Sequence, residues 1–400
     1  MLNAGALLIP VFLLIMTFEW LISYYKRDKR YSSENTIMNL TIGAFDQIGS
    51  LVYFALLYFV MEYVYSHFRI YTTTNVYYQW IGGYIAVDFI SYWYHRFSHR
   101  TNILWAGHIT HHSSEFYNFS NGFRTSLFQG INRIIFWALL PIFGFSPVIL
   151  LLILKISGLY DFLVHTEYVP KLPMLEKIFV TPSLHRVHHG KNDLYIDKNY
   201  GSTFIIWDRL FGTFQEETEK VKYGITSDYR DNNPVTAITY YYRYLWKYIK
   251  SAPDLFDKIK ILFMPPEWKP KQSNSAPISF IIKPGFLVLP HLKAYAYFQL
   301  LCCVAGMVIL LVYKNYLSGW EIFICSLIGV VAMTNATKIL NGSIRHNFEK
   351  QELVRLTCGL LLIFITIVFY RHFYLWVVSS FLLTSIALIV RDLTSHQKSH

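Results

Sequence analysis

Long apolar runs are the feature of this sequence that most constrains its fold. The first extends from Ala6 to Tyr25 and is interrupted only by Glu19, and a run of about 20 apolar residues is long enough to cross a bilayer as a helix. The 400-residue chain is 54% hydrophobic and 18% aromatic, and only 15% of its residues are charged, well below the charged share of an average soluble domain. We therefore predict an all-α fold, a multi-pass membrane helical bundle.

Further membrane helices are predicted on both sides of a polar central region. Two precede it, at about 40–63 and 77–94, and four follow it, near 294–313, 320–340, 353–370 and 373–390. Two other apolar arms, 131–143 and 148–164, are separated by the residues Gly-Phe-Ser-Pro at 144–147. The first arm is too short to cross the bilayer, and a Gly/Ser/Pro break turns the chain. We therefore expect a re-entrant hairpin whose turn lies inside the membrane.

The basic run at 26–30, which closes the first apolar run, places that end in the cytoplasm under the positive-inside rule. The polar segment at 66–75 is then external, and the polar region from Thr166 to about Leu292 is expected to form a helical cap on the cytoplasmic side. Within it, 240–250 alternates Tyr, Trp, Arg and Lys, as expected of a helix in the headgroup region. The net charge of +11 suits anionic lipid headgroups, and no Arg/Lys-rich nucleic-acid motif is present.

Four parts follow from this pattern. Residues 1–80 are expected to be N-terminal anchor helices, and residues 81–270 a catalytic region that includes the hairpin and the cap. Residues 271–292 are expected to be a linker, and residues 293–400 C-terminal transmembrane helices. The membrane is expected to be the endoplasmic reticulum if the chain comes from a eukaryote and the inner membrane if it comes from a bacterium, with the central polar region on the cytoplasmic face.

Three histidine stretches point to metal chemistry. The first has the spacing H-x-x-x-H, and the other two share H-x-x-H-H; their members are His95, His99, His108, His111, His112, His185, His188 and His189. Residues three and four apart share a face of a helix, so H-x-x-x-H is expected to aim two imidazoles one way and H-x-x-H-H three. Each stretch is a ready set of metal ligands. With 15 His in 400 residues, two H-x-x-H-H triplets arise by chance in about 2 of 10,000 such chains, by counting template matches.

Eight clustered imidazoles exceed what one metal needs. Neutral imidazole suits zinc, iron, copper and nickel, but structural zinc closes at four ligands and catalytic zinc at three plus water. Two metals with redox chemistry are therefore favoured, and no H-E-x-x-H protease motif is present. A zinc-dependent membrane hydrolase and a non-catalytic metal- or lipid-binding protein stay as alternatives, and anaerobic incubation with lipids separates the three.

Several further residues are candidates for the site. Asp88 lies seven positions before His95, on the same helix face, so it orients a ligand histidine or bonds nearby aromatic residues. Asp161 lies one turn before His165, which makes His165 either a ninth ligand or a structural histidine. Glu115, in the polar run that ends at Asn118, could ligate a metal, support a histidine or contact a cofactor.

The runs Asp88–Arg96, His108–Glu115 and Thr181–Gly190 together resemble the fatty acid hydroxylase/sterol desaturase superfamily. The additional runs Ile196–Gly201, which contains Asn199, and Trp207–Thr213 are most similar to its alkylglycerol monooxygenase branch. The resemblance covers roughly 81–270, about half of the chain.

The resemblance implies a histidine-held di-iron centre that uses O2 to oxidise a lipid C–H bond. In the alkylglycerol monooxygenase branch the hydroxylated carbon adjoins an ether oxygen, so the product collapses to a fatty aldehyde and a glycerol, and tetrahydrobiopterin is the reductant. Asp88, Glu115, Asn118, Asp161 and Asn199 are the expected catalytic-site residues beside the histidines. Sterol, fatty acid and carotenoid hydroxylases or desaturases are alternatives within the superfamily.

One position departs from that branch. Where the branch has a glutamate, this chain has Arg100, and a guanidinium offers only donors and fixed positive charge. Arg100 and Glu115 are therefore both expected in the cofactor site, with Glu115 able to take over the carboxylate's contact. A ferredoxin or cytochrome that docks on the basic cap is kept as the alternative electron donor.

Overall fold

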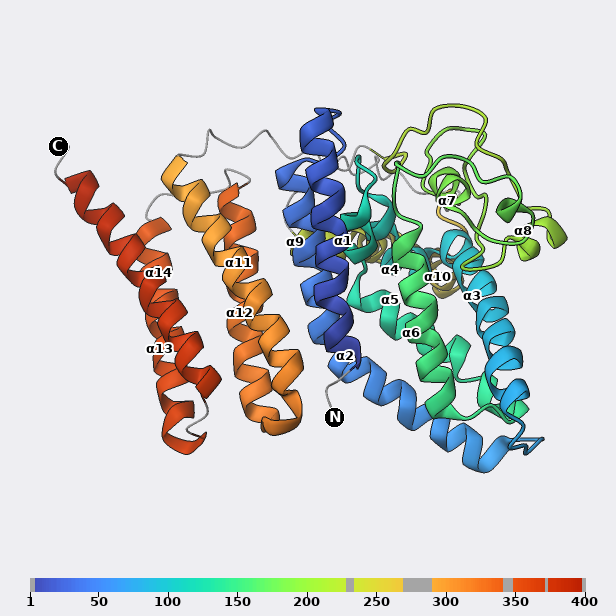
Figure 1. The fold of residues 1–400 in the computed structure, drawn as a ribbon, viewed down its shortest axis with the longest axis horizontal. Coiled ribbons are helices and arrows are strands. Elements are labelled where there is room, and N and C mark those ends of the chain that lie inside the picture. The colour runs from blue at the N-terminus through green and yellow to red at the C-terminus, as the bar shows by residue number, and fades with distance from the viewer. Residues whose placement is uncertain (1–3, 228–233, 269–289, 341–347, 371–372, 398–400) are drawn as a thin grey trace. The chain divides into compact units, whose positions relative to one another are not determined.

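The computed structural model describes residues 4–227, 234–268, 290–340, 348–370 and 373–397 (Figure 1). Within these ranges the regular elements are helices, accompanied by two isolated bridges, Phe179–Phe204 and Gly190–Tyr223. The predicted all-α class is therefore confirmed. The chain divides into two compact units, one built mainly of 14–231 and 236–281 and the other mainly of 282–400. Most of the predicted linker at 271–292 lies outside the described residues.

The apolar runs form helices close to their predicted limits. Helices α1 (Ala4–Lys26) and α2 (Ser33–Phe68) come first, and α2 is longer at both ends than the predicted 40–63. At its start the Ser32 hydroxyl accepts a hydrogen bond from the Asn35 backbone N–H at 3.4 Å, which caps the helix. By length and composition α2, α11 (Pro290–Tyr313) and α12 (Gly319–Leu340) could each cross a membrane; for the other predicted spans, membrane crossing stays a prediction.

Four helices of the larger unit position the histidines. A single π turn, η1 (Tyr78–Gly82), leads into α3 (Gly83–Arg100), and α4 (Asn102–His112) follows directly. The two hairpin arms are α5 (Leu127–Trp137), extended by η3 (Leu140–Phe143), and α6 (Pro147–Leu163). Apolar side chains of α2, α3, α5 and α6 pack together in one core, among them Leu57, Val87, Trp137 and Ile153.

The hairpin turns at Gly144, which has the left-handed φ of +85° that glycine adopts without strain. A Cβ atom there would lie 2.2 Å from the Tyr71 carbonyl oxygen, so the turn also needs glycine for its close approach. Gln79 donates to the Gly144 carbonyl and accepts from the Ser146 N–H, both at 2.8 Å. The turn thus packs against residues 70–79, most of which lie in the segment predicted to be external. The position of the turn inside the membrane stays a prediction.

The predicted helical cap is helical only in part. Between 164 and 227 it contains three short helices, η4 (Leu175–Lys177), α7 (Pro182–His188) and α8 (Ile206–Leu210), and the rest is loop. Side chains that bond the backbone hold this loop, including Asn199 and Asp208, and such bonds compete with helix formation. Two longer helices follow, α9 (Pro234–Ser251) and α10 (Leu255–Phe263), and α9 contains the predicted interfacial segment.

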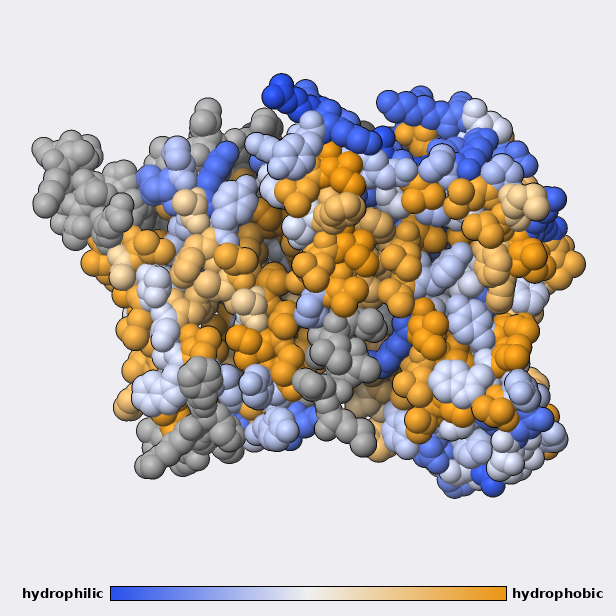
Figure 2. Space-filling view, viewed as in Figure 1, coloured by the Kyte–Doolittle hydropathy of each residue, from blue (hydrophilic) through white to orange (hydrophobic). Residues whose placement is uncertain are grey.

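The smaller unit contains α11, η5 (Lys314–Tyr316), α12, α13 (Phe348–Tyr370) and α14 (Phe373–Gln397). All four predicted C-terminal apolar runs are therefore helices. Buried polar groups link them, because Glu352 of α13 accepts hydrogen bonds from Tyr295 of α11 and Asn335 of α12, and Gln299 of α11 donates to Ser385 of α14. In each unit, hydrophobic side chains gather over the middle of the helices and hydrophilic ones towards their ends (Figure 2).

Candidate metal centre

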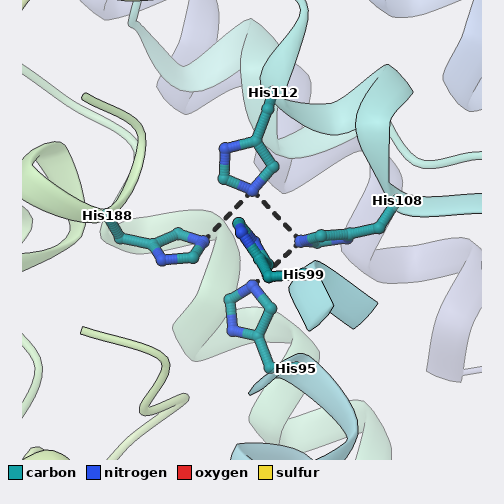
Figure 3. A group of neighbouring side chains, drawn as sticks. All are labelled: His95, His99, His108, His112 and His188. Atoms are coloured by element: carbon teal, nitrogen blue, oxygen red, sulfur yellow. Dashed lines mark hydrogen bonds between the residues drawn. The ribbon is translucent and has the colours of Figure 1, made fainter. Parts of the chain in front are cut away.

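Nine histidines of the larger unit gather into two neighbouring groups. The first contains His95, His99, His108, His112 and His188 (Figure 3), and the second contains His111, His165, His185 and His189. Within each group every histidine offers one ring nitrogen, and these nitrogens all lie within 4.8 Å of one another. The structure therefore brings together all eight histidines of the three stretches, and His165 as a ninth.

The H-x-x-H-H spacing divides each triplet between the two groups. On α4, His108 and His112 belong to the first group and His111 to the second. On α7 and its C-cap, His185 and His189 belong to the second group and His188 to the first. Residues four apart on a helix differ by about 40° in direction, whereas neighbours differ by about 100°. The expectation that one triplet aims three imidazoles the same way is therefore corrected: two point one way and the third points to the other group.

Hydrogen bonds fix which nitrogen of these rings faces the centre of each group. Five Nδ1 atoms lie within 3.3 Å of an amide oxygen, namely those of His95 (Tyr200 O), His108 (Gln129 Oε1), His111 (Arg124 O), His165 (Asp161 O) and His188 (Lys198 O). An amide oxygen only accepts, so Nδ1 carries the proton and Nε2 presents a lone pair. This is how ligand histidines are usually held.

Most of the Nε2 atoms that face each other present lone pairs, so they cannot all form hydrogen bonds with one another. In the first group they lie 2.9 to 3.1 Å apart, between His95 and His108, His108 and His112, and His112 and His188. In the second group the separations are 3.3 Å (His111 to His165) and 3.2 Å (His165 to His185). Ligands at a metal–nitrogen distance of about 2.0–2.1 Å lie about 2.9 Å apart in octahedral and about 3.4 Å apart in tetrahedral geometry.

Two ring nitrogens without a hydrogen-bond partner also indicate that a metal ion fits each group. The Nε2 atoms of His99 and His189 are buried and have no hydrogen-bond partner in the structure, and such atoms are costly unless an ion or water meets them. The spacing, the lone-pair direction and these orphaned atoms all fit one metal ion in each group.

Burial keeps these histidines neutral. Desolvation, followed by repulsion from neighbouring imidazoles, lowers the pKa of His112, His185 and His189 well below the ordinary value. Desolvation lowers the pKa of His165 to about 4, although its bond to the Asp161 carbonyl opposes the shift. Metal ligation requires neutral imidazole, so near pH 7 the side chains need not lose a proton to bind.

Asp88 acts on a loop and not on a histidine. Its buried carboxylate accepts hydrogen bonds from Thr203 N at 2.7 Å, Phe204 N at 3.2 Å and Trp207 Nε1 at 2.8 Å. Asp88 lies seven residues before His95 on α3, which is about 10 Å along the helix axis. This distance is too long for the predicted contact with the His95 ring. The expectation that Asp88 orients a ligand histidine directly is therefore corrected, and the alternative that it bonds a nearby aromatic residue is the one seen, with Trp207.

A second carboxylate, which the sequence did not single out, holds the same loop. Asp208 accepts from the backbone N–H groups of Tyr200 and Gly201, both at 2.7 Å, and burial raises its pKa to about 6. The Tyr200 carbonyl in turn accepts from His95. Together Asp88 and Asp208 fix the loop that orients this histidine.

The other predicted catalytic-site residues occupy three different places. Asp161 touches the centre through its carbonyl, while its carboxylate accepts from Ser202 Oγ at 2.7 Å. Asn199, with φ +54°, donates to the Leu184 carbonyl beside His185 at 3.0 Å. Asn118 caps η2 (Phe119–Phe123) by accepting from Ser120 N. Asn199 and Asn118 therefore position backbone segments.

Two cavities reach the histidines, and they touch different ones. A cavity of about 190 Å³ among α2, α3, α5 and α6 is lined by His95, His108, His111, His165 and His185. A second cavity, of about 470 Å³, is lined by His99, His112, His188 and His189. No histidine lines both, so the two groups lie between the cavities.

Of the two predicted cofactor-site residues, one lines the larger cavity. Arg100 does so, with its guanidinium 2.7 Å from an Asp197 carboxylate oxygen and 2.8 Å from one of Glu267. Glu115 is exposed in the loop after α4 and is not among the residues that line either cavity. The pair with Arg100 and the bond to His99 lower the pKa of Asp197, although desolvation opposes them.

Two contacts that support the centre were not predicted from the sequence. Gln129, one of two side-chain amides on α5, accepts from the His108 ring at 3.2 Å, and nothing in its spacing marked it. Glu19, the one charge in the first apolar run, is buried and accepts from Tyr31, the Phe119 N–H and Thr166, which follows His165. An ionisable residue in an apolar helix is a recognisable signal, and here it ties α1 to the centre.

Comparison with known proteins gives consistent matches. The family model for fatty acid hydroxylase matches residues 80–213. Alkylglycerol monooxygenase of Homo sapiens is 35% identical over 263 residues, which are 65% of this chain and 59% of that protein. Alkylglycerol monooxygenase of Danio rerio is 31% identical over 362 residues, 88% of this chain and 80% of that protein.

A bacterial relative matches a shorter region. The ornithine lipid hydroxylase OlsE of Rhizobium tropici is 32% identical over 146 residues, 34% of this chain and 42% of that protein. No solved structure matches the chain. The alignment to the human protein covers less than two thirds of its length.

Proposed function

The chain belongs to the fatty acid hydroxylase family and is similar to the alkylglycerol monooxygenases over most of its length. On that premise we propose that it hydroxylates a lipid C–H bond next to an ether oxygen. The observation that carries the proposal is the pair of histidine groups between two cavities. The alternative substrates within the superfamily, sterols, fatty acids and carotenoids, are outcomes of the test below.

Iron is the proposed metal in both groups. The ligand set is nine imidazoles, and no carboxylate belongs to either group among the described residues; imidazole suits iron as well as zinc, and nine ligands suit two ions. When bound, the iron pair would supply oxygen activation. The described side chains would hold it with neutral Nε2 atoms backed by amide oxygens, such as the Tyr200 and Lys198 carbonyls.

The overall reaction balances with a two-electron donor. The ether lipid, O2, two electrons and two protons give a lipid hydroxylated at the carbon beside the ether oxygen, and water. The new hydroxyl then passes its proton to the ether oxygen as the C–O bond breaks, which leaves a fatty aldehyde and a glycerol. The smaller cavity, between membrane helices, is the proposed site for the carbon that reacts.

The larger cavity is the proposed site for the reductant, tetrahydrobiopterin. Its volume of about 470 Å³ lies in the range of small-molecule sites, and aromatic side chains such as Trp105 and Tyr241 line it beside charged ones. Arg100 does not stand alone there, because Glu267 and Asp197 bring two carboxylates to it. Glu267, with 61% of its side chain exposed, offers the acceptor that the arginine lacks.

Sidedness is part of the same proposal. We place the histidine centre on the cytoplasmic face, where the basic run at 26–30 and the cap lie in the predicted topology and where soluble reductants are available. A ferredoxin or cytochrome that docks on this basic face would be the donor if the pterin does not serve.

Purified membranes incubated with a 1-alkylglycerol test the function. Fatty aldehyde should form only with both O2 and tetrahydrobiopterin present, and metal analysis of anaerobically purified protein should give two irons per chain. His108→Ala should abolish aldehyde formation, whereas His67→Ala should not, because His67 is exposed and bonds only its own helix. Activity that needs a soluble protein fraction would exclude the pterin, and lipid hydrolysis without O2 would favour a zinc hydrolase.

A further inference from the structure

The smaller cavity is too small for a whole lipid. It measures about 190 Å³, whereas a cavity of about 150 Å³ accommodates a molecule the size of benzene. The cavity therefore has room for roughly six to eight heavy atoms, about those of a glycerol group or a short piece of chain. A long-chain ether lipid that reacts at the histidines must leave most of itself outside.

Polar groups line the part of this cavity that is nearest to the histidines. Asp161 and Gln129 each bond a histidine ring, and Ser202 donates to the Asp161 carboxylate at 2.7 Å. One helical turn further along α5 lies Arg133, which lines the cavity and whose buried Nε atom has no hydrogen-bond partner. A buried N–H donor without a partner favours a ligand that brings an oxygen atom.

The cavity has an opening at Gly158. This residue lines the cavity and is itself exposed, and a Cβ atom built on it would meet nothing within 4 Å. It lies on α6 seven residues before His165, about 10 Å along the helix axis. The path from the surface to the histidines is therefore short, and Gly158 leaves it open.

The helix that carries the opening is apolar on its outer side. Val148, Leu152 and Ile156 of α6 are exposed, with fractions of 54%, 41% and 48%, on the side of the helix that points away from Gly158. Phe54 of α2 and Leu154 also line the cavity, and Lys155 places its ammonium 5.7 Å from the Phe54 ring centroid. Exposed aliphatic side chains in a membrane protein of this composition indicate contact with lipid chains.

We propose that the lipid binds with its oxygen-bearing end inside this cavity and its alkyl tail passing out through the opening at Gly158 into the bilayer. The polar groups and the unpartnered Arg133 donor then meet the lipid's oxygen atoms, and the carbon beside the ether oxygen lies at the boundary, next to the histidines. This inference rests on the proposed function for the identity of the lipid, but the path itself rests on the cavity and its opening.

Substrate chain length is the first consequence. A tail enclosed in a protein pocket is discriminated by about 1–3 kcal/mol per methylene, a factor of 10 or more. A tail that lies in the bilayer is not enclosed by protein side chains, so added methylenes do not change its contacts with the protein. Dodecyl- and octadecylglycerol presented in the same vesicles should therefore differ in kcat/KM by less than about threefold. A fall of tenfold or more with the longer chain would overturn the proposal.

Cysteine labelling tests the opening without adding bulk. In a chain whose four native cysteines, Cys302, Cys303, Cys325 and Cys358, are replaced by alanine, Gly158→Cys is compared with Ile156→Cys. Ile156 is exposed on the same helix but does not line the cavity, since residues two apart point about 200° apart. Both cysteines should react with a lipid-soluble maleimide, but only the cysteine at 158 should be protected by octadecylglycerol.

Turnover of the labelled proteins completes the test. Labelling at 158 should lower ether-lipid turnover at least tenfold, and labelling at 156 should leave it within about twofold. Unchanged turnover after labelling at 158, or equal protection at both sites, would overturn the proposal. Protection confined to 158 in a protein that turns over no ether lipid would support the opening and refute the proposed function, so the two failures are distinguishable.

Discussion

Replacing Asp88 by asparagine is expected to destabilise the metal centre from about 10 Å away along α3. The carboxylate accepts from three buried donors, Thr203 N, Phe204 N and Trp207 Nε1. An amide keeps the shape of the side chain but turns one oxygen into an NH2 group, so at least one of the three donors faces another donor.

The size of the effect follows from these contacts. One unsatisfied buried N–H costs about 1–3 kcal/mol, and replacing a charged acceptor by a neutral one weakens each remaining bond by about 1 kcal/mol. The sum is about 3–5 kcal/mol, and at about 2–4 °C per kcal/mol for a unit of this size the Tm should fall by roughly 10 °C. Because the same loop carries the Tyr200 carbonyl that holds His95, bound metal should also be lost during dialysis.

Thermal unfolding in detergent and metal content after dialysis measure these two effects. Asp193→Asn removes the same charge at an exposed position of the cap, and a surface change of this kind should alter stability by no more than about 0.5 kcal/mol. If Asp88→Asn lowers the Tm no more than the control and retains both metals, the loop does not depend on this carboxylate and the reasoning is wrong.

Three further results are expected. Gln129→Leu should weaken metal binding about 10–100-fold, because it removes the acceptor that orients His108; a competition titration with a chelator checks this, and an unchanged affinity would contradict it. Glu19→Leu should lower the Tm and the retained metal together, since Glu19 bonds Thr166 and the Phe119 N–H from α1; a fall in Tm with unchanged metal content would show that these bonds do not support the centre. The metal-free protein should lose stability as the pH falls below about 6.5, because histidines in the unfolded chain bind protons there. The buried histidines of the folded protein stay neutral to lower pH, since burial lowers the pKa of His165, for example, to about 4. A Tm that is constant or higher at pH 5 than at pH 7.5 would refute this.

Helices and ligand identities were predictable from the sequence because both depend on local patterns. An apolar run such as 294–313 forms a helix in lipid because its backbone groups must bond within the segment. The H-x-x-H-H spacing brings its first and last histidines to one side of a helix wherever the helix lies. All nine predicted metal ligands therefore lie in the two groups. The hairpin break at Gly144 was also visible, because a glycine beside a Ser-Pro pair marks a turn.

What the tertiary structure decided is the partition of those ligands and the roles of the residues around them. Spacing alone could not show that His111 belongs with His165 and His188 with His95, since this depends on how α4 and α7 face each other. The same holds for Asp88 and Gln129, whose hydrogen-bond partners are 21 or more residues away in the sequence. It also holds for Gly158, which none of the other described segments of the chain covers. A helix sets the direction of each side chain, but only the packing of distant segments decides what that side chain meets.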